Sequence, residues 1–246
     1  MNLILYYLFV YLIEAIILWL YCNRIFTSRK NTFLSLLITI GMFSLLIPVA
    51  ILTNAALNAF CSFIVYLCCI VLNYDSKPVW ALFHALALTI LMALSEGLIA
   101  AAIPDITIYA FRDGNIHSSA FTFVILSKSV YLCISQLVTR IFSKDTVNNA
   151  SIRKSTLMLY LIPVMSSIIT VSLGYICLNG KLSGSDSVIV FICLVLLLSI
   201  NILTFYLQQD ISQKNVEYAR LQIELQKETD TEHYYNYVQE VNEKQH

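Results

Sequence analysis

Long apolar runs follow one another along the chain and are separated by short polar stretches. A membrane-spanning helix needs about 20 mostly apolar residues, and windows of that size predict seven spans. The predicted spans cover residues 2–22, 33–52, 55–72, 79–103, 119–142, 155–178 and 187–207. Only Thr53 and Asn54 separate the second and third spans, which predicts a tight helical hairpin, and Pro48 is expected to kink the second span. The pattern predicts an all-α integral membrane protein with about seven transmembrane helices.

The composition agrees with a membrane protein. Of 246 residues, 59% are hydrophobic and only 12% are charged, about half the charged fraction of soluble domains. No Lys or Arg precedes the first apolar run and no small-residue cleavage site follows it, so this run is expected to remain as an anchor. The seven cysteines lie in or beside apolar runs without metal-type spacing, which favours small apolar residues over disulfides or a metal site.

The basic residues predict the orientation of the spans. Alternating loops of a seven-span chain hold seven Lys and Arg residues on one side and two on the other. The first set is Arg24, Arg29, Lys30, Lys77, Lys144, Arg153 and Lys154, and the second is Arg112 and Lys181. Because short cytoplasmic loops are enriched in Lys and Arg, the N-terminus is expected outside and the C-terminus in the cytoplasm of a multi-pass cell-membrane protein. A six-span alternative would place both termini on one side.

Three charged residues, Glu14, Glu96 and Lys128, lie inside the apolar spans. A charge near the centre of a bilayer costs about 3 kcal/mol, so these side chains are expected to face other helices. A rise of about 1.5 Å per residue puts Glu96 and Lys128 at similar depths on successive antiparallel helices, which predicts an ion pair between them. No partner for Glu14 can be assigned. The pair is interpreted either as structural, or as the floor of an outward-facing ligand cavity or part of a switch.

The chain continues past Leu207 without Pro or Gly into a polar, helix-prone tail. We therefore expect a transmembrane domain over residues 1–208 and a cytoplasmic helix over residues 209–246, joined as one unbroken helix. The tail, from Gln209 to His246, holds four of the 15 basic and eight of the 15 acidic residues.

Apolar positions in the tail predict a coiled coil. Ile211, Tyr218, Leu221 and Leu225 are spaced by seven, three and four residues, which suits a two-stranded coiled coil. A second seam in a different register contains Tyr234, Val238, Val241 and Gln245. An isolated polar helix is marginally stable, so a homodimer is expected, and a solvated, partly frayed tail is the alternative.

The tail LQIELQKETDTEHYYNYVQEVNEKQ, directly after closely spaced spans with short external loops, resembles the membrane sensor region of AgrC-type histidine kinases of the GHKL class. In that family an aromatic pair, here Tyr234 and Tyr235, precedes a His-Asp pair whose histidine accepts phosphate from ATP. His246 is a possible phosphoacceptor, but it lies close to Tyr235, and the reactive histidine is expected beyond residue 246. Residues 1–246 contain no counterpart of the family's ATP-binding domain, so no cofactor is expected in this chain.

The resemblance also implies partners. The ligand would be a short secreted peptide, and the external loop residues available to touch it are Tyr109, Phe111, Arg112, Asp113 and His117. The dimer seam would include Tyr218, Leu221, Leu225 and Val238. A response regulator would act downstream, membrane lipid would surround the spans, and no nucleic acid is expected.

Two other functions stay open. A small-molecule transporter could use Glu14, Glu96 and Lys128 along its path, although the sequence has no clear internal repeat of the kind found in many transporters. A membrane-embedded peptide protease would need a reactive Cys near His84. The sequence contains no recognisable catalytic triad motif or glycine-rich phosphate loop.

Overall fold

The computed structural model of the protein describes residues 3–52, 55–104, 118–141, 162, 164–166, 168–170, 172–173 and 184–244. Its helices are α1 (Leu3–Ile25), α2 (Thr32–Ser44), α3 (Ile47–Ile51), α4 (Ala55–Asn73), α5 (Pro78–Ala102), α7 (Ser118–Ile141) and α11 (Gly184–Lys244). Two short strands, β1 (Thr27–Ser28) and β2 (Tyr74–Asp75), pair with each other. The described chain is thus all-α apart from this two-residue ladder, as the apolar pattern predicts.

Five helical segments are long and apolar enough to cross a membrane. They are Leu3–Ile25, Thr32–Ile51, Pro78–Ala102, Ser119–Arg140 and the apolar part of Ser185–Val238, while Leu57–Asn73 is shorter. These helices agree with a membrane-spanning protein. The predicted span 155–178 and the turn at Thr53 and Asn54 lie largely outside the described residues.

Pro48 divides the second predicted span, as expected. Helix α2 ends at Ser44, and α3 starts at Ile47 with a proline in its first turn. Proline has no N–H to donate, and its ring clashes with the carbonyl of the residue four positions earlier, here Ser44. Proline is tolerated in the first turn of a helix, so the chain restarts as α3 after the break.

The paired strands join two loops that are distant in sequence. β1 follows α1, and β2 follows α4, with Thr27 opposite Asp75 and Ser28 opposite Tyr74. The Arg29 guanidinium lies 3.2 Å from the Asp75 carboxylate, and the Arg29 backbone N–H donates to the Asn73 carbonyl. The apolar pattern does not predict this ladder, which holds the ends of α1 and α4 together at one end of the bundle.

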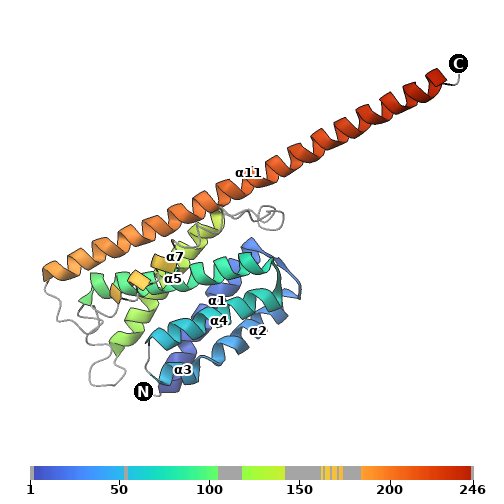
Figure 1. Ribbon diagram of the computed structural model, residues 1–246. Helices are drawn as coiled ribbons and strands as arrows, with labels where there is room; N and C mark the ends of the chain where they lie inside the picture. Colours follow the sequence, from blue (N-terminus) through green and yellow to red (C-terminus); the bar gives the residue numbers. More distant parts are fainter. Residues whose placement is uncertain are drawn as a thin grey trace.

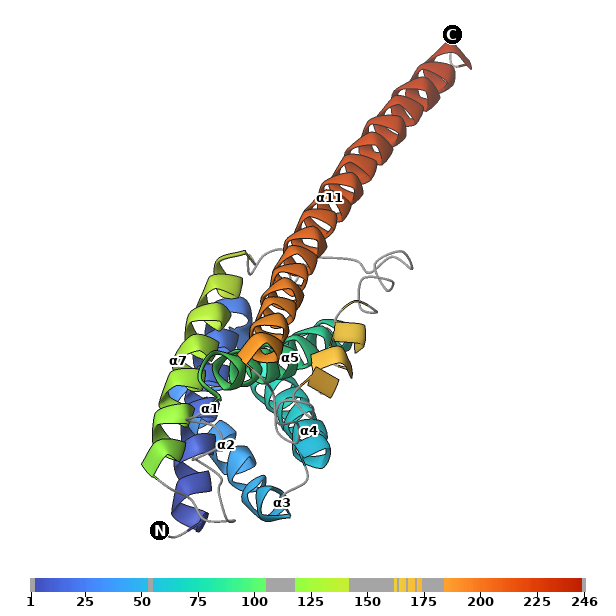
Figure 2. The ribbon, with the colours of Figure 1, turned by 90° about the vertical axis from the view of Figure 1, so that its left-hand side faces the viewer.

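Helix α5 is the centre of the bundle and packs against α4, α7 and α11. More than half of its apolar window is buried, and aromatic rings surround its first turns. His84 packs against Phe26, Phe83 and Trp80, and Phe83 makes an edge contact with Phe205 of α11. Figures 1 and 2 show α5 between α11 and the pair of α4 and α2. A change in α5 packing therefore reaches α11 directly.

Helix α11 is one unbroken helix of 61 residues, about 90 Å long at 1.5 Å per residue. This confirms the continuous helix expected from the sequence. One face is buried against the bundle as far as Ser212, and Val216 still packs against the core. From Glu217 to Val238 every side chain is exposed, and the helix extends well beyond the other helices (Figures 1 and 2). We call residues 217–244 the stalk.

Replacing Gly97 with leucine should loosen the contact between α5 and α11. A Cβ at Gly97 would lie 3.3 Å from Leu194 Cδ1, whereas a Cβ at Gly41 would have no neighbour within 4 Å. Overpacking costs about 1–3 kcal/mol, so Gly97→Leu should lower the melting temperature of the detergent-solubilised protein by several degrees. Gly41→Leu, the matched control, should change it little. Equal shifts for the two variants would contradict this packing.

Candidate functional site

Glu14, Glu96 and Lys128 form a buried charge cluster between three helices. The Lys128 ammonium on α7 donates to Glu14 Oε1 on α1 and to Glu96 Oε1 on α5, at 2.5 Å in each case. The side chains of Glu14 and Lys128 are 3% exposed, and that of Glu96 is 39% exposed. The charge cluster therefore has one partly accessible side, at Glu96.

The ion pair between Glu96 and Lys128, expected from matching depth, is present in the structure. The bond from Lys128 to Glu14 was missed because depth was compared only between successive helices. Glu14 lies 11 residues after the start of α1 (14 − 3), and Lys128 lies 10 residues after the start of α7 (128 − 118). Extending the depth comparison to every pair of spans could have found this contact.

Tyrosines from three helices surround the charge cluster. Tyr6 and Tyr11 on α1, Tyr66 on α4 and Tyr131 on α7 are buried and close enough to interact electrostatically with its charged groups. The Tyr11 hydroxyl donates to Asn58 Oδ1 at 2.8 Å. A polar region therefore lies inside a bundle whose outer surface is apolar.

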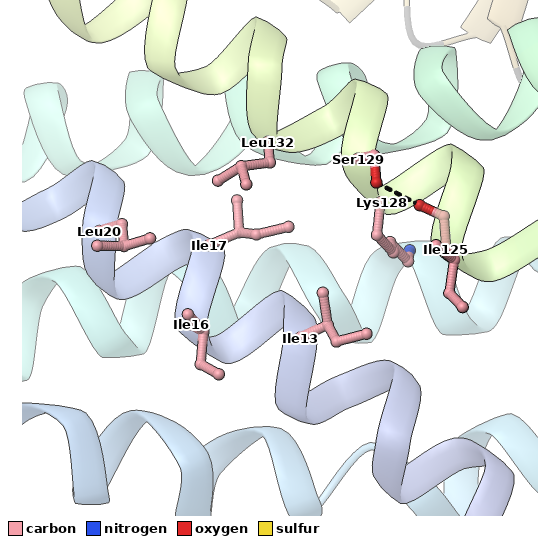
Figure 3. Close-up of a pocket in the computed structure, with 8 residues that line it drawn as sticks. All are labelled: Ile13, Ile16, Ile17, Leu20, Ile125, Lys128, Ser129 and Leu132. Carbon is pink, nitrogen blue, oxygen red and sulfur yellow. Dashed lines mark hydrogen bonds between the residues drawn. The ribbon is translucent and has the colours of Figure 1, made fainter.

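A groove of about 190 Å³ lies between α1 and α7 beside the charge cluster (Figure 3). It is lined by Ile13, Ile16, Ile17, Leu20, Ile125, Lys128, Ser129 and Leu132. The Ser129 hydroxyl donates to the Ile125 carbonyl at 2.7 Å, and the Lys128 ammonium is bonded to the two carboxylates. Ligand pockets usually have volumes of 300–1,000 Å³, so this groove is too small and too apolar to be a strong ligand site.

Two other buried polar side chains, Asn201 and His84, have structural partners. Asn201 of α11 donates to Ser166 Oγ at 2.6 Å. His84 Nδ1 lies 2.8 Å from the Tyr21 hydroxyl, and its ring is packed among aromatic side chains. This environment gives His84 a packing role and supplies no support for a protease.

The remaining predicted site residues fall into two groups. Tyr109, Phe111, Arg112, Asp113, His117 and His246 lie outside the described residues. Tyr218, Leu221, Leu225 and Val238 all lie exposed on the stalk, at 62%, 48%, 63% and 36%. Within the described ranges, no group of three or more His, Cys, Asp or Glu side chains could hold a metal ion.

Comparisons with models of protein families, with curated proteins and with solved structures found no match.

Removing the ammonium of the charge cluster should strongly destabilise the bundle. Lys128→Met leaves Glu14 buried without its partner, and breaking a buried pair costs about 3–5 kcal/mol. The matched control is Lys214→Met, because Lys214 pairs with Asp210 on the exposed surface of α11 at 2.8 Å, where a pair contributes about 0–1 kcal/mol. Thermal unfolding in detergent measures both. A Lys128→Met protein as stable as Lys214→Met would contradict the assigned role of the cluster.

Proposed function

We propose that the protein is the membrane receptor part of a two-component sensor histidine kinase. In this proposal its spans detect a secreted peptide, and its stalk passes the signal as part of a homodimer to a kinase domain in the cytoplasm. ATP and the response regulator belong to that downstream part. The observation that carries the proposal is the continuity of α11 from inside the bundle to the end of the stalk.

The packing of α11 supports a signalling role. Leu194, Phe205 and Gln208 are buried against the bundle, so any change in the packing of α5 or α7 acts on α11 itself. A regular helix has no flexible joint to absorb a rotation or translation, and the stalk would move with the buried part. A ligand produces such a change only if it binds one packing more tightly than another.

The surface of the stalk supports a second copy as its partner. Exposed apolar and aromatic side chains occur along its length, among them Tyr218, Leu221, Leu225, Tyr234 and Tyr235. A monomeric stalk would leave them in water, and a long polar helix gains most of its stability from packing. Pairing two stalks through Tyr218, Leu221 and Leu225 follows the coiled-coil spacing.

The orientation is part of the proposal and draws support from the strand pair. β1 and β2 bring the loop after α1 and the loop after α4 to one end of the bundle, which agrees with helices that cross the membrane alternately. Arg24, Arg29, Lys30 and Lys77 are in or beside these loops. Basic residues favour the cytoplasmic side, so this end would face the cytoplasm, with the N-terminus outside.

A small-molecule transporter is the second candidate, and the charge cluster favours it. Ionisable groups inside a membrane bundle often mark substrate or ion paths. If the protein is a transporter, Glu96→Gln should abolish substrate uptake into vesicles, and changes in the stalk should leave uptake unchanged. A receptor would show no uptake.

Disulfide crosslinking in membranes tests the paired stalk. Leu221→Cys and Leu225→Cys should each form a covalent dimer on mild oxidation, because both residues lie on the proposed seam. Ile223→Cys is the matched control: Ile223 is also exposed, but it lies two residues from each seam position and so nearly opposite on the helix, at 100° per residue. The unsubstituted chain measures the background from the native cysteines. Equal dimer yields at the three positions, or none, would contradict the seam.

A further inference from the structure

The charge cluster contains two carboxyl groups and only one ammonium group. With all three ionised, it carries a net charge of −1 at the point where α1, α5 and α7 meet. In the described part of the chain, Glu14 and Lys128 are the only acidic or basic residues, other than His84, that are buried. His84 is packed among Phe26, Phe83, Trp80 and Tyr21 rather than at the cluster. An uncompensated charge in a low-dielectric interior is strongly unfavourable.

One oxygen of the cluster has no partner. Glu14 Oε1 accepts from Lys128, but Glu14 Oε2 is fully buried without a hydrogen bond among the described residues. The other titratable groups around the cluster are the hydroxyls of Tyr6 and Tyr11 on α1, Tyr66 on α4 and Tyr131 on α7. These hydroxyls are neutral, so they do not offset the excess negative charge.

We propose that the charge cluster is a proton-binding site, with the proton on Glu14 Oε2. A proton from water adds to a lone pair of the Glu14 carboxylate, and the charge of the cluster changes from −1 to 0. In this proposal the charge remains on Glu96, which keeps its bond to Lys128 and whose side chain is 39% exposed at the surface of the bundle. Glu14 is almost fully buried, so neutralising it removes the larger desolvation cost.

The partly exposed side of the cluster supplies a route for exchange. Glu96 is the member of the cluster that reaches the surface of the bundle, and Lys128 is bonded to Oε1 of both carboxylates. The Lys128 ammonium passes a proton to Glu14 Oε1 and recovers one from protonated Glu96, and a half-turn of the Glu14 carboxyl group then brings the proton to the unpartnered position. Release of the proton would leave a negative charge between α1, α5 and α7 and would favour entry of water there. Since α5 also packs against α11, proton occupancy would be linked to the packing of α11. The site does not depend on the proposed receptor function.

Infrared difference spectroscopy, in which the spectrum of each variant is subtracted from that of the wild-type full chain, tests the site. The detergent must lack ester carbonyls, because they absorb near the carbonyl stretch of a neutral carboxyl group. The wild-type protein near neutral pH should show the carbonyl stretch of one buried, neutral carboxyl group, shifted in D2O. The band should be lost in Glu14→Gln and also in Glu96→Gln. In either variant the one remaining carboxylate balances the charge of the Lys128 ammonium, so no carboxyl group needs to be protonated. In Lys128→Met, where both carboxyls would be neutral, the band should roughly double.

Glu217→Gln is the matched control, because Glu217 is exposed on the stalk and is not part of the charge cluster. This variant should keep the wild-type band. Each glutamine variant keeps one carboxylate paired with the Lys128 ammonium, with no net charge, and should fold. The test therefore does not depend on Lys128→Met. The absence of a neutral-carboxyl band in the wild type, or its survival in either glutamine variant, would overturn the proposal. A wild-type band that disappears on adding Na⁺ at constant pH would also overturn it, in favour of a metal-cation site.

Discussion

The three-way contact of Lys128 with Glu14 and Glu96 is the interaction on which the packing of the bundle depends. Water is not there to solvate charged groups in the interior of a membrane bundle, so each charge needs a partner from another helix. Lys128 meets this need by joining α1, α5 and α7 at one point. The rest of the bundle is then arranged around α5, which has α4 and α11 on its other sides.

The position of α5 connects the charge cluster with the stalk. Gly97 is adjacent in sequence to Glu96 and lies against Leu194 of α11, where the absence of a side chain permits close approach. At its other end, α5 contacts α11 through Phe83 and Phe205. One helix, α5, therefore connects the charge cluster with α11, whose last part is the stalk. This arrangement suits a receptor that reports the packing of its spans along α11.

Periodicity and composition were sufficient to predict much of the fold. Long apolar runs predicted helices at the observed positions, Pro48 predicted the break between α2 and α3, and the lack of Pro or Gly predicted the continuity of α11. The strand pair was missed because two-residue ladders carry no periodic signal. In the candidate site, matching depth predicted the contact of Glu96 with Lys128. The contact with Glu14 depends on which non-adjacent spans pack together, and a single sequence does not contain that information directly.

The central claim is that α11 is one rigid helix across the boundary between bundle and stalk. Electron–electron distance measurement between spin labels at Leu203 and Gln226 tests it most directly, in a background without native cysteines and with labelled protomers diluted by unlabelled protein. The 23 helical steps from residue 203 to residue 226 predict a backbone separation of about 35 Å at 1.5 Å per residue, with a narrow distribution. A broad distribution centred at shorter distances would reveal a joint near residue 209 or beyond and would contradict transmission through α11.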